Sequence, residues 1–190
     1  MQKSFRMFIS FVSCAALFSA CQSAQPASES ASTEIAVSAP AQAVVASELI
    51  LPQELISKVE AESILGESAI DCTPSENAVV GQSLCFYDAA DEDSWRFLQI
   101  GVSQQANIPA ENGTTPQSIY DTTKEAFGED AVMIDGIGDE AMRVTGGYYI
   151  MSDGYLLQIS AGNTGDESVL AILDQAGKLA IANLKSILAK

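Results

Sequence analysis

The chain has 190 residues, with 25 acidic side chains, nine basic ones and no histidine. A formal net charge of −16 argues against a nucleic-acid partner, because such binding depends on neutralising phosphates. Without histidine, the chain lacks the commonest general base and the commonest transition-metal ligand.

The segment before Cys21 has the composition of an export signal. Lys3 and Arg6 precede a mostly apolar run over residues 7–18, and small residues precede Cys21. The run is too short to span a membrane comfortably. We therefore expect residues 1–20 to be a signal peptide that takes no part in the fold.

The sequence Phe18-Ser19-Ala20-Cys21 resembles the lipobox of bacterial lipoproteins. That pattern has an apolar residue, two small residues and a cysteine, and Phe18 stands where leucine is usual. The resemblance extends from Met1 to Cys21 and implies cleavage before Cys21, diacylation of its thiol by lipids such as palmitate, and acylation of the new amine. The alternative is ordinary secretion with an incidental cysteine.

A triacylated cysteine would anchor the chain firmly, since one acyl chain alone binds a bilayer only marginally. The lipoprotein resemblance also implies a location in the cell envelope, exposed to the periplasm. The residue after the cysteine is Gln22 rather than aspartate. By the same resemblance, this indicates the outer membrane in a cell with two membranes. The strong negative charge repels anionic lipid heads, so we expect membrane contact through the N-terminal lipid alone.

A tether and one globular domain are predicted after Cys21. Residues 22–45 are mainly Ala, Ser, Pro, Gln and Glu without an apolar period, which is typical of a disordered segment. We therefore assign residues 21–46 to the lipidated cysteine and its tether, and residues 47–190 to the domain. A flexible coil of ~25 residues has a root-mean-square span of roughly 28 Å, enough to hold the domain clear of the lipid heads.

The domain is predicted to be α+β, with an antiparallel sheet packed against three helices. The first helix should begin near Pro52, contain a capping-box sequence at Ser57, and end at Gly66. Asp153-Gly154 is a two-residue hairpin signal, which favours antiparallel pairing. The other helices are expected at 117–127 and after a cap at Thr164 or Asp166. Strands are expected at 68–72, 83–87, 95–103, 131–134, 141–144, 148–151 and 155–161, with a loop at 73–81.

Two short matches favour a duplication. Residues 65–70 resemble residues 127–132, and Leu98-Gln99-Ile100 recurs as Leu157-Gln158-Ile159. Self-similarity at a regular spacing is typical of internal repeats, so these matches suggest two duplicated half-domains of about 60 residues each. Two helix ends and two strands of similar composition would also produce these matches without a duplication.

The overall layout is similar to small, uncharacterised domains of bacterial lipoproteins. The features are a helix ending in Leu65-Gly66, a cysteine-bearing hairpin, the segment Gly136-Ile137-Gly138-Asp139-Glu140-Ala141, and a final amphipathic helix. This resemblance covers residues 55–188 and implies no particular activity. The segment Gly136-Ile137-Gly138 leads into a strand, so we interpret it as a tight turn and not as a dinucleotide fingerprint.

Cys72 and Cys85 are predicted to form a disulfide. An exported protein meets an oxidising compartment, where an isolated pair of cysteines is most simply bonded. The two residues alone could not complete a tetrahedral zinc site.

Two acidic clusters are candidate cation or catalytic sites. The spacing of the first does not match an EF-hand, so a solvated hairpin tip explains it better than calcium. The second could supply an acid pair, but a turn rich in aspartate accounts for it. We assign no metal, cofactor or catalytic residue. The clusters are Asp88, Asp91, Glu92 and Asp93, and Asp135, Asp139 and Glu140.

Aromatic residues supply the remaining candidate site. Tyr148, Tyr149 and Tyr155 alternate around a hairpin, where they could form a partner surface or pack beneath a helix. Trp95 is expected in the core. We expect a membrane-anchored lipoprotein that is not an enzyme, with a binding or envelope-assembly domain and an envelope protein as the candidate partner. The alternative is a carboxylate-dependent enzyme or a calcium-binding module; a flat aromatic patch would favour binding.

Overall fold

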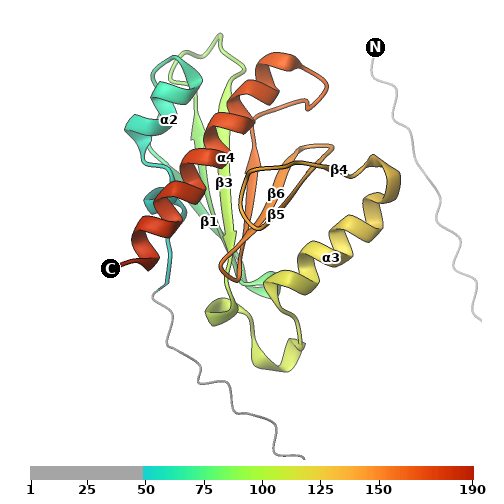
Figure 1. Ribbon diagram of the computed structural model, residues 1–190. Coiled ribbons are helices and arrows are strands. Elements are labelled where there is room, and N and C mark those ends of the chain that lie inside the picture. The colour runs from blue at the N-terminus through green and yellow to red at the C-terminus, as the bar shows by residue number, and fades with distance from the viewer. Residues whose placement is uncertain (1–48) are drawn as a thin grey trace, which may run out of the picture. The chain divides into compact units, whose positions relative to one another are not determined.

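Seven strands form one antiparallel sheet in the order β1-β2-β3-β7-β6-β5-β4 (Figure 1). The computed structural model describes residues 49–190, so the predicted signal peptide, Cys21 and the tether lie outside the described residues. The α+β class and antiparallel sheet are confirmed. The strands are β1 (Thr73–Asn77), β2 (Gln82–Asp88), β3 (Phe97–Ser103), β4 (Val132–Met133), β5 (Glu140–Val144), β6 (Gly147–Ser152) and β7 (Tyr155–Ser160).

Four α-helices accompany the sheet within residues 49–190, not the three expected. The segment predicted as one helix divides at Ser57, which caps the second helix and forms a capping box with Glu60. Burial alone would raise the pKa of the Glu60 carboxyl, but hydrogen bonds from Ser57 and Asn183 outweigh it and lower that pKa. The helices are α1 (Pro52–Leu55), α2 (Lys58–Leu65), α3 (Pro116–Phe127) and α4 (Glu167–Leu188).

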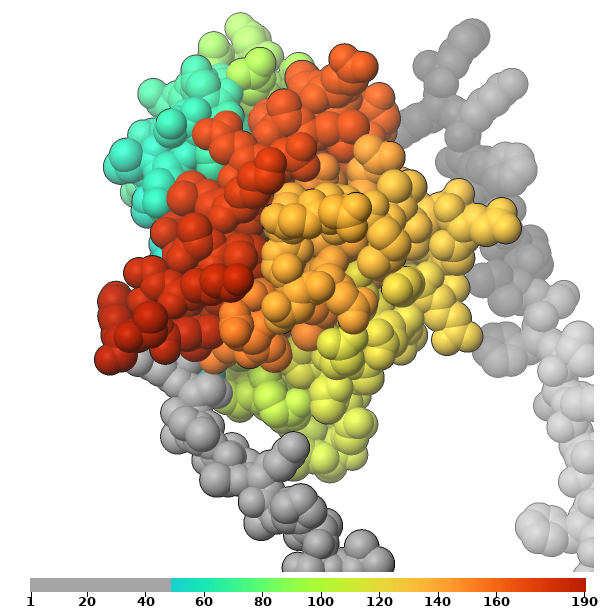
Figure 2. Space-filling model, viewed as in Figure 1, coloured from blue at the N-terminus to red at the C-terminus, as the bar shows by residue number. Residues whose placement is uncertain are grey.

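The main core lies between the sheet and α1, α2 and α4. Alternate residues of the central strands, including Ile100 and Leu157, are fully buried against this helical layer. The α4 helix crosses the sheet (Figures 1 and 2), with Leu173 at 0% exposure. A Cβ added at Gly177 would lie 3.2 Å from Ile150 Cδ1, so the glycine lets α4 approach the sheet closely.

The opposite face of the sheet carries α3. This helix packs on β6 and β7 and buries a second cluster made by Tyr120, Met142, Val144, Met151 and Leu156. Thr115 caps it, accepting a hydrogen bond from the Ser118 amide. Leu84 and Phe86 of β2 and Phe97 and Gln99 of β3 stay only half-buried on this face, since α3 covers the other half of the sheet.

The edge strand β1 corrects the prediction for residues 68–81. The expected strand at 68–72 is reduced to a single bridge between Ala69 and Ala89, and the expected loop contains β1. The sequence of β1 is Thr-Pro-Ser-Glu-Asn, which has little strand propensity. Pro74 is tolerated because the strand lies at the edge of the sheet.

Two other turns form where the sequence predicts them. Asp153 and Gly154 both have positive φ and join β6 to β7, as the hairpin signal predicts. Gly138 also has positive φ, and a Cβ there would lie 2.5 Å from the Met151 carbonyl oxygen, so the Gly136–Gly138 segment is a tight turn.

The predicted duplication is not confirmed. The matching tripeptides do lie side by side, because Ile100 of β3 pairs with Ile159 of β7. A twofold axis between these strands would leave equivalent helices on one face of the sheet. However, α2 packs in the main core and α3 on the opposite face, so the two halves are arranged differently.

Trp95 is not in the core. Its side chain is 62% exposed on the turn between β2 and β3. The prediction was wrong because this residue precedes β3 and lies outside the alternation that sends Leu98 and Ile100 into the core.

Candidate functional site

The most distinctive surface is the half of the sheet that α3 leaves uncovered. In β2, Cys85 and Tyr87 point into the main core, whereas Leu84 and Phe86 point to the opposite face and are half-buried. Phe97 of β3 stacks on Phe86, with ring centroids 5.2 Å apart. This face therefore presents an ordered apolar and aromatic surface.

Amide side chains continue this surface across the sheet. Gln82 Nε2 donates to Gln158 Oε1 at 3.0 Å, which links β2 to β7 over the intervening β3. The space they cross is open because β3 carries Gly101, where an added Cβ would lie 2.8 Å from Leu84 Cδ2. The missing side chain thus lets Leu84 and Gln82 lie flat over β3.

This surface is uncharged apart from one end. Strand pairing places ten side chains on it, and the acidic Asp88 stands only at the end of β2. On a chain of net charge −16, an uncharged region of this extent stands out. We call it the open face, and its residues are Thr73, Ser75, Asn77, Gln82, Leu84, Phe86, Phe97, Gln99, Gln158 and Ser160.

An uncharged groove of ≈ 290 Å³ lies between the β1–β2 turn and α3. It is lined by Val80 and by residues of α3 that include Ser118, Ile119 and Thr122. Among the described residues, no ionisable side chain contributes to its lining. Its chemistry therefore matches that of the open face.

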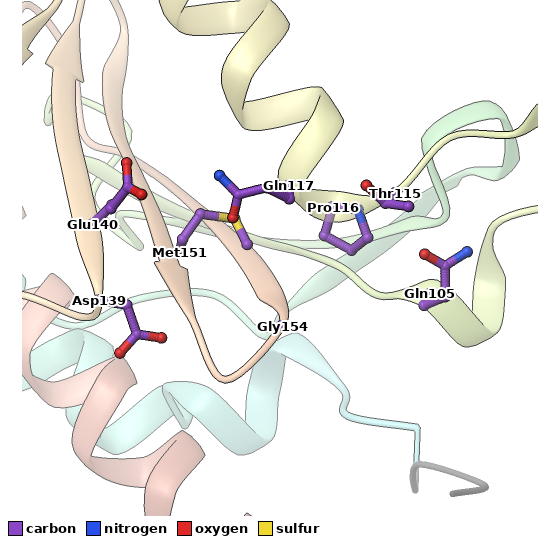
Figure 3. Close-up of a pocket in the computed structure, with 8 residues that line it drawn as sticks. All are labelled: Gln105, Thr115, Pro116, Gln117, Asp139, Glu140, Met151 and Gly154. Atoms are coloured by element: carbon purple, nitrogen blue, oxygen red, sulfur yellow. The ribbon is translucent and has the colours of Figure 1, made fainter. Parts of the chain in front are cut away.

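A second hollow, of ≈ 270 Å³, lies at the start of α3 (Figure 3). Asp139 and Glu140 form one side, and Pro116 and Met151 are among its other lining residues. Asp139 Oδ2 accepts a hydrogen bond of 2.9 Å from the Asp153 amide, so this carboxylate stabilises the β6–β7 turn. Asp139, one of the acidic residues singled out from the sequence, thus has a structural use.

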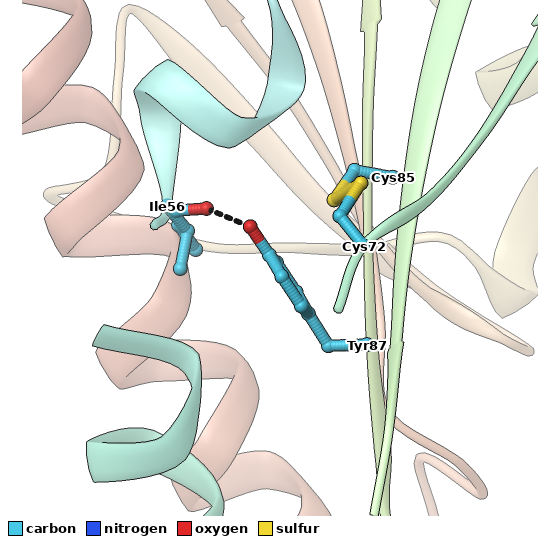
Figure 4. The surroundings of a disulfide bond; sticks show 4 residues. All are labelled: Ile56, Cys72, Cys85 and Tyr87. Carbon is cyan, nitrogen blue, oxygen red and sulfur yellow. Dashed lines mark hydrogen bonds between the residues drawn. A yellow bond between two sulfur atoms is a disulfide. The ribbon is translucent and has the colours of Figure 1, made fainter. Parts of the chain in front are cut away.

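Cys72 and Cys85 form the predicted disulfide (Figure 4). Their Cα atoms are 5.5 Å apart, within the usual range for a bonded pair. The bond ties the segment after α2 to β2. Beside it, the Tyr87 hydroxyl donates to the Ile56 carbonyl oxygen at 2.8 Å, which links β2 to the helical layer.

The three candidate tyrosines do not form one surface. Tyr148 and Tyr155 are 4% and 6% exposed and belong to the main core. Tyr148 donates to Asp174 Oδ1 of α4 at 2.8 Å. Burial and this hydrogen bond raise the pKa of Tyr148 to about 12. Only Tyr149, half-buried on the face that carries α3, is accessible to a partner.

In the acidic turn between β2 and β3, two carboxylates accept hydrogen bonds from backbone amides of the same turn. Asp91 Oδ1 accepts from the Asp93 amide at 3.0 Å, and Asp88 Oδ1 accepts from the Ala89 amide at 3.1 Å. Within residues 49–190, no three side chains of the metal-binding types gather closely enough to hold an ion.

The open face was missed by the sequence reading, although a signal for it exists. Leu84 and Phe86 alternate with Cys85 and Tyr87, so both faces of β2 carry apolar residues. That pattern indicates a strand with two apolar faces. It does not reveal that only one of them is covered by helices.

No protein-family model, curated protein or solved structure matches this chain. In the described part of the chain, every helix is too short or too polar to cross a bilayer.

Proposed function

We propose that the protein is a lipid-anchored, non-catalytic binding protein of the cell envelope, and that the open face contacts a protein partner. The anchor is a lipid on Cys21, inferred from the lipobox-like sequence. Gln22 after the cysteine favours the outer membrane in a cell with two membranes. The observation that carries the binding role is the sheet surface that α3 leaves uncovered, which is aromatic, amide-rich and uncharged except at Asp88.

The size of the open face limits how a partner can use it. The open face spans four strands, β1, β2, β3 and β7, of 5, 7, 7 and 6 residues. With strands ~4.8 Å apart and ~3.4 Å per residue, they cover roughly 410 Å². A stable complex buries about 800 Å² on each partner. The open face therefore suits an extended segment of a partner, or a transient contact, better than an entire globular surface.

The chemistry of the open face limits which residue types a bound segment can have. Phe86 and Phe97 offer apolar area, while Gln99 and Gln158 can donate and accept hydrogen bonds. A charged segment would lose hydration here without gaining an ionic partner. We therefore expect a segment of small apolar and neutral polar residues.

The catalytic alternative has less support. Of the side chains lining the acidic hollow, Thr115 accepts a hydrogen bond from the backbone of α3 and Asp139 from that of the β6–β7 turn. Within the described chain, no hydrogen bond joins the Thr115 hydroxyl to a carboxylate that could activate it. The hollow is thus explained by the fold, whereas the open face is not.

Photo-crosslinking in intact cells tests the proposal. A benzoylphenylalanine at Gln99 should give a discrete protein adduct, and one at Gln175, exposed on α4, should not. Adding Phe86→Glu to the Gln99 probe should abolish the adduct, because it places a charge on the contact surface. Adding Ala171→Glu, on the exposed side of α4, is the matched control.

Two outcomes would reject the binding role of the open face. One is equal adduct formation from Gln99 and Gln175. The other is an adduct from Gln99 that is unaffected by Phe86→Glu in protein whose thermal unfolding matches the parent.

A further inference from the structure

Three leucines stand exposed at the end of the domain where the described chain begins. Leu49, Leu51 and Leu188 are 52%, 46% and 44% exposed. The start of the chain and the end of α4 are held together, since Asn183 Nδ2 donates to the Leu55 carbonyl oxygen at 2.9 Å. Figure 1 shows both segments at the same end of the molecule.

The C-terminal part of α4 is basic, in contrast to the chain as a whole. Residues 175–190 contain three lysines and no acidic residue, although acids outnumber bases 25 to nine overall. Lys185 and Lys190 are exposed in and just beyond the last turn of α4. We call Leu49, Leu51, Lys185, Leu188 and Lys190 the tethered end.

The acidic turn lies at the other end of α4. A Cβ at Gly162, just before α4, would be 3.6 Å from Trp95 of that turn. With 22 residues at ~1.5 Å each, α4 separates the two ends by about 33 Å. The Debye length at physiological ionic strength is ~8 Å. A surface in contact with the tethered end is therefore screened from Asp91, Glu92 and Asp93.

Among the described residues, two acidic side chains near the tethered end, Glu54 and Glu60, accept hydrogen bonds from uncharged groups of the chain itself. Glu54 Oε2 accepts from the Leu51 amide at 2.8 Å, and the Glu60 carboxylate accepts from Ser57 and Asn183. They weaken the positive potential but leave the exposed lysines and leucines free to meet a surface.

We infer that the tethered end rests against the surface of a bilayer that contains anionic lipid, with its leucines at the headgroup level. The occupant is a lipid surface because the tether joins the domain at this end, so a lipid on Cys21 would keep it nearest the bilayer. Exposed apolar residues flanked by lysines match an interface with anionic heads. The inference rests on the proposed anchor. It revises the expectation, drawn from net charge, that only the lipid touches the membrane.

Hydrogen–deuterium exchange of the lipidated full chain in vesicles tests the inference. In vesicles that mix one part of phosphatidylglycerol with two parts of phosphatidylcholine, residues 185–190 and 49–51 should exchange at least about threefold more slowly than in phosphatidylcholine alone. The turn at residues 89–96 should exchange equally in both vesicles, because it points away from the bilayer.

Two matched charge reversals sharpen the test. Lys185 and Lys124 both lie in the last turn of a helix, α4 and α3 respectively, and both are exposed. One lysine near an anionic bilayer strengthens attraction roughly fivefold, so Lys185→Glu should remove the protection. Lys124→Glu should retain it. Equal effects of the two variants, or no protection in anionic vesicles, would overturn the inference.

The anchor and the surface contact can fail separately. If the full chain carries no lipid, the chain from Gln22 is sedimented with the same anionic vesicles, since the core lies within residues 49–190. Binding that Lys185→Glu weakens and Lys124→Glu does not would support the surface contact without the anchor. No binding there would overturn it. A lipidated chain without protection would leave the anchor intact and reject the contact.

Discussion

Two buried tyrosines on opposite faces of the sheet differ in how their hydroxyl groups are satisfied. Tyr148 donates to Asp174, whereas the Tyr120 hydroxyl is buried without a protein partner among the described residues. Burial, and then the charges of Glu140 and Asp121, raise the pKa of Tyr120 from 10.0 to about 12. The environment of each hydroxyl thus decides what its removal would do.

Tyr120→Phe should leave stability at pH 7 unchanged or slightly increased, because it removes an unsatisfied polar group. Tyr148→Phe should cost about 0.5–1.5 kcal/mol through the lost hydrogen bond. Both folded-state pKa values lie above the unfolded value, so the stability each neutral tyrosine contributes is present below pH 10 and lost between pH 10 and about 12.

Urea unfolding of the parent and both variants at pH 7 and at pH 11 measures these effects. Each variant should lose less stability than the parent on going to pH 11. A Tyr120→Phe variant less stable at pH 7 than Tyr148→Phe would show that the Tyr120 hydroxyl has a strong partner, such as an ordered water.

The disulfide is the other residue-level feature with a measurable role. Cys85 is fully buried, and its bond to Cys72 holds the chain just before the exposed edge strand β1. Replacing both cysteines by alanine should cost about 2–5 kcal/mol. Urea unfolding of the oxidised parent and the double variant gives the difference. Two free thiols in unreduced, denatured parent protein would contradict the bond.

At the level of elements, the longest helix should control stability. The α4 helix spans 22 residues and supplies several fully buried side chains to the main core. Leu173→Asp would place an unpaired charge at a position with 0% exposure, which typically costs several kcal/mol. We expect the domain to unfold or to melt far below the parent temperature.

Asp91→Asn is the control, because Asp91 is exposed and asparagine keeps the acceptor for the Asp93 amide. Its melting temperature should stay within about 2 °C of the parent. Thermal melts of the chain from Ser47 make the comparison. If Leu173→Asp melts like the parent, α4 is not docked on the sheet.

Elements with strong local signals were predictable from the sequence. The α4 helix has a long apolar period after the Asp166 cap, and the hairpin at Asp153-Gly154 has the residues its turn needs. The edge strand β1 was not predictable, because Thr-Pro-Ser-Glu-Asn lacks strand formers and is held by pairing with β2 and by the nearby disulfide. Ser57 was recognised as a cap, but not as the residue that separates two helices.

At the scale of the whole molecule, the candidate site was harder to predict than the fold class. Hairpin signals are local and favour an antiparallel sheet. Which face each helix covers depends on contacts between distant segments, such as α3 with β6 and β7. The open face exists because α3 covers only one half of its side of the sheet. The alternating pattern of β2 therefore indicated apolar residues on both faces but could not show which of them are exposed. The tethered end likewise depends on α1 and α4 meeting.

The two proposed surfaces give the molecule a consistent arrangement. The tethered end and the acidic turn lie at opposite ends of α4, and the open face lies on the side of the sheet away from α4. A domain resting on its tethered end would therefore leave the open face accessible to a partner in the envelope. This arrangement of the domain requires that the chain be held at a membrane.

Metabolic labelling with an alkyne fatty acid tests that central requirement most directly. The full chain and its Cys21→Ser variant are expressed in a bacterium, labelled and compared after conjugation to a fluorophore. The lipid anchor predicts label on the parent and none on Cys21→Ser, with the signal of the variant uncleaved or miscleaved. Equal label on both chains, or none on either, would contradict it.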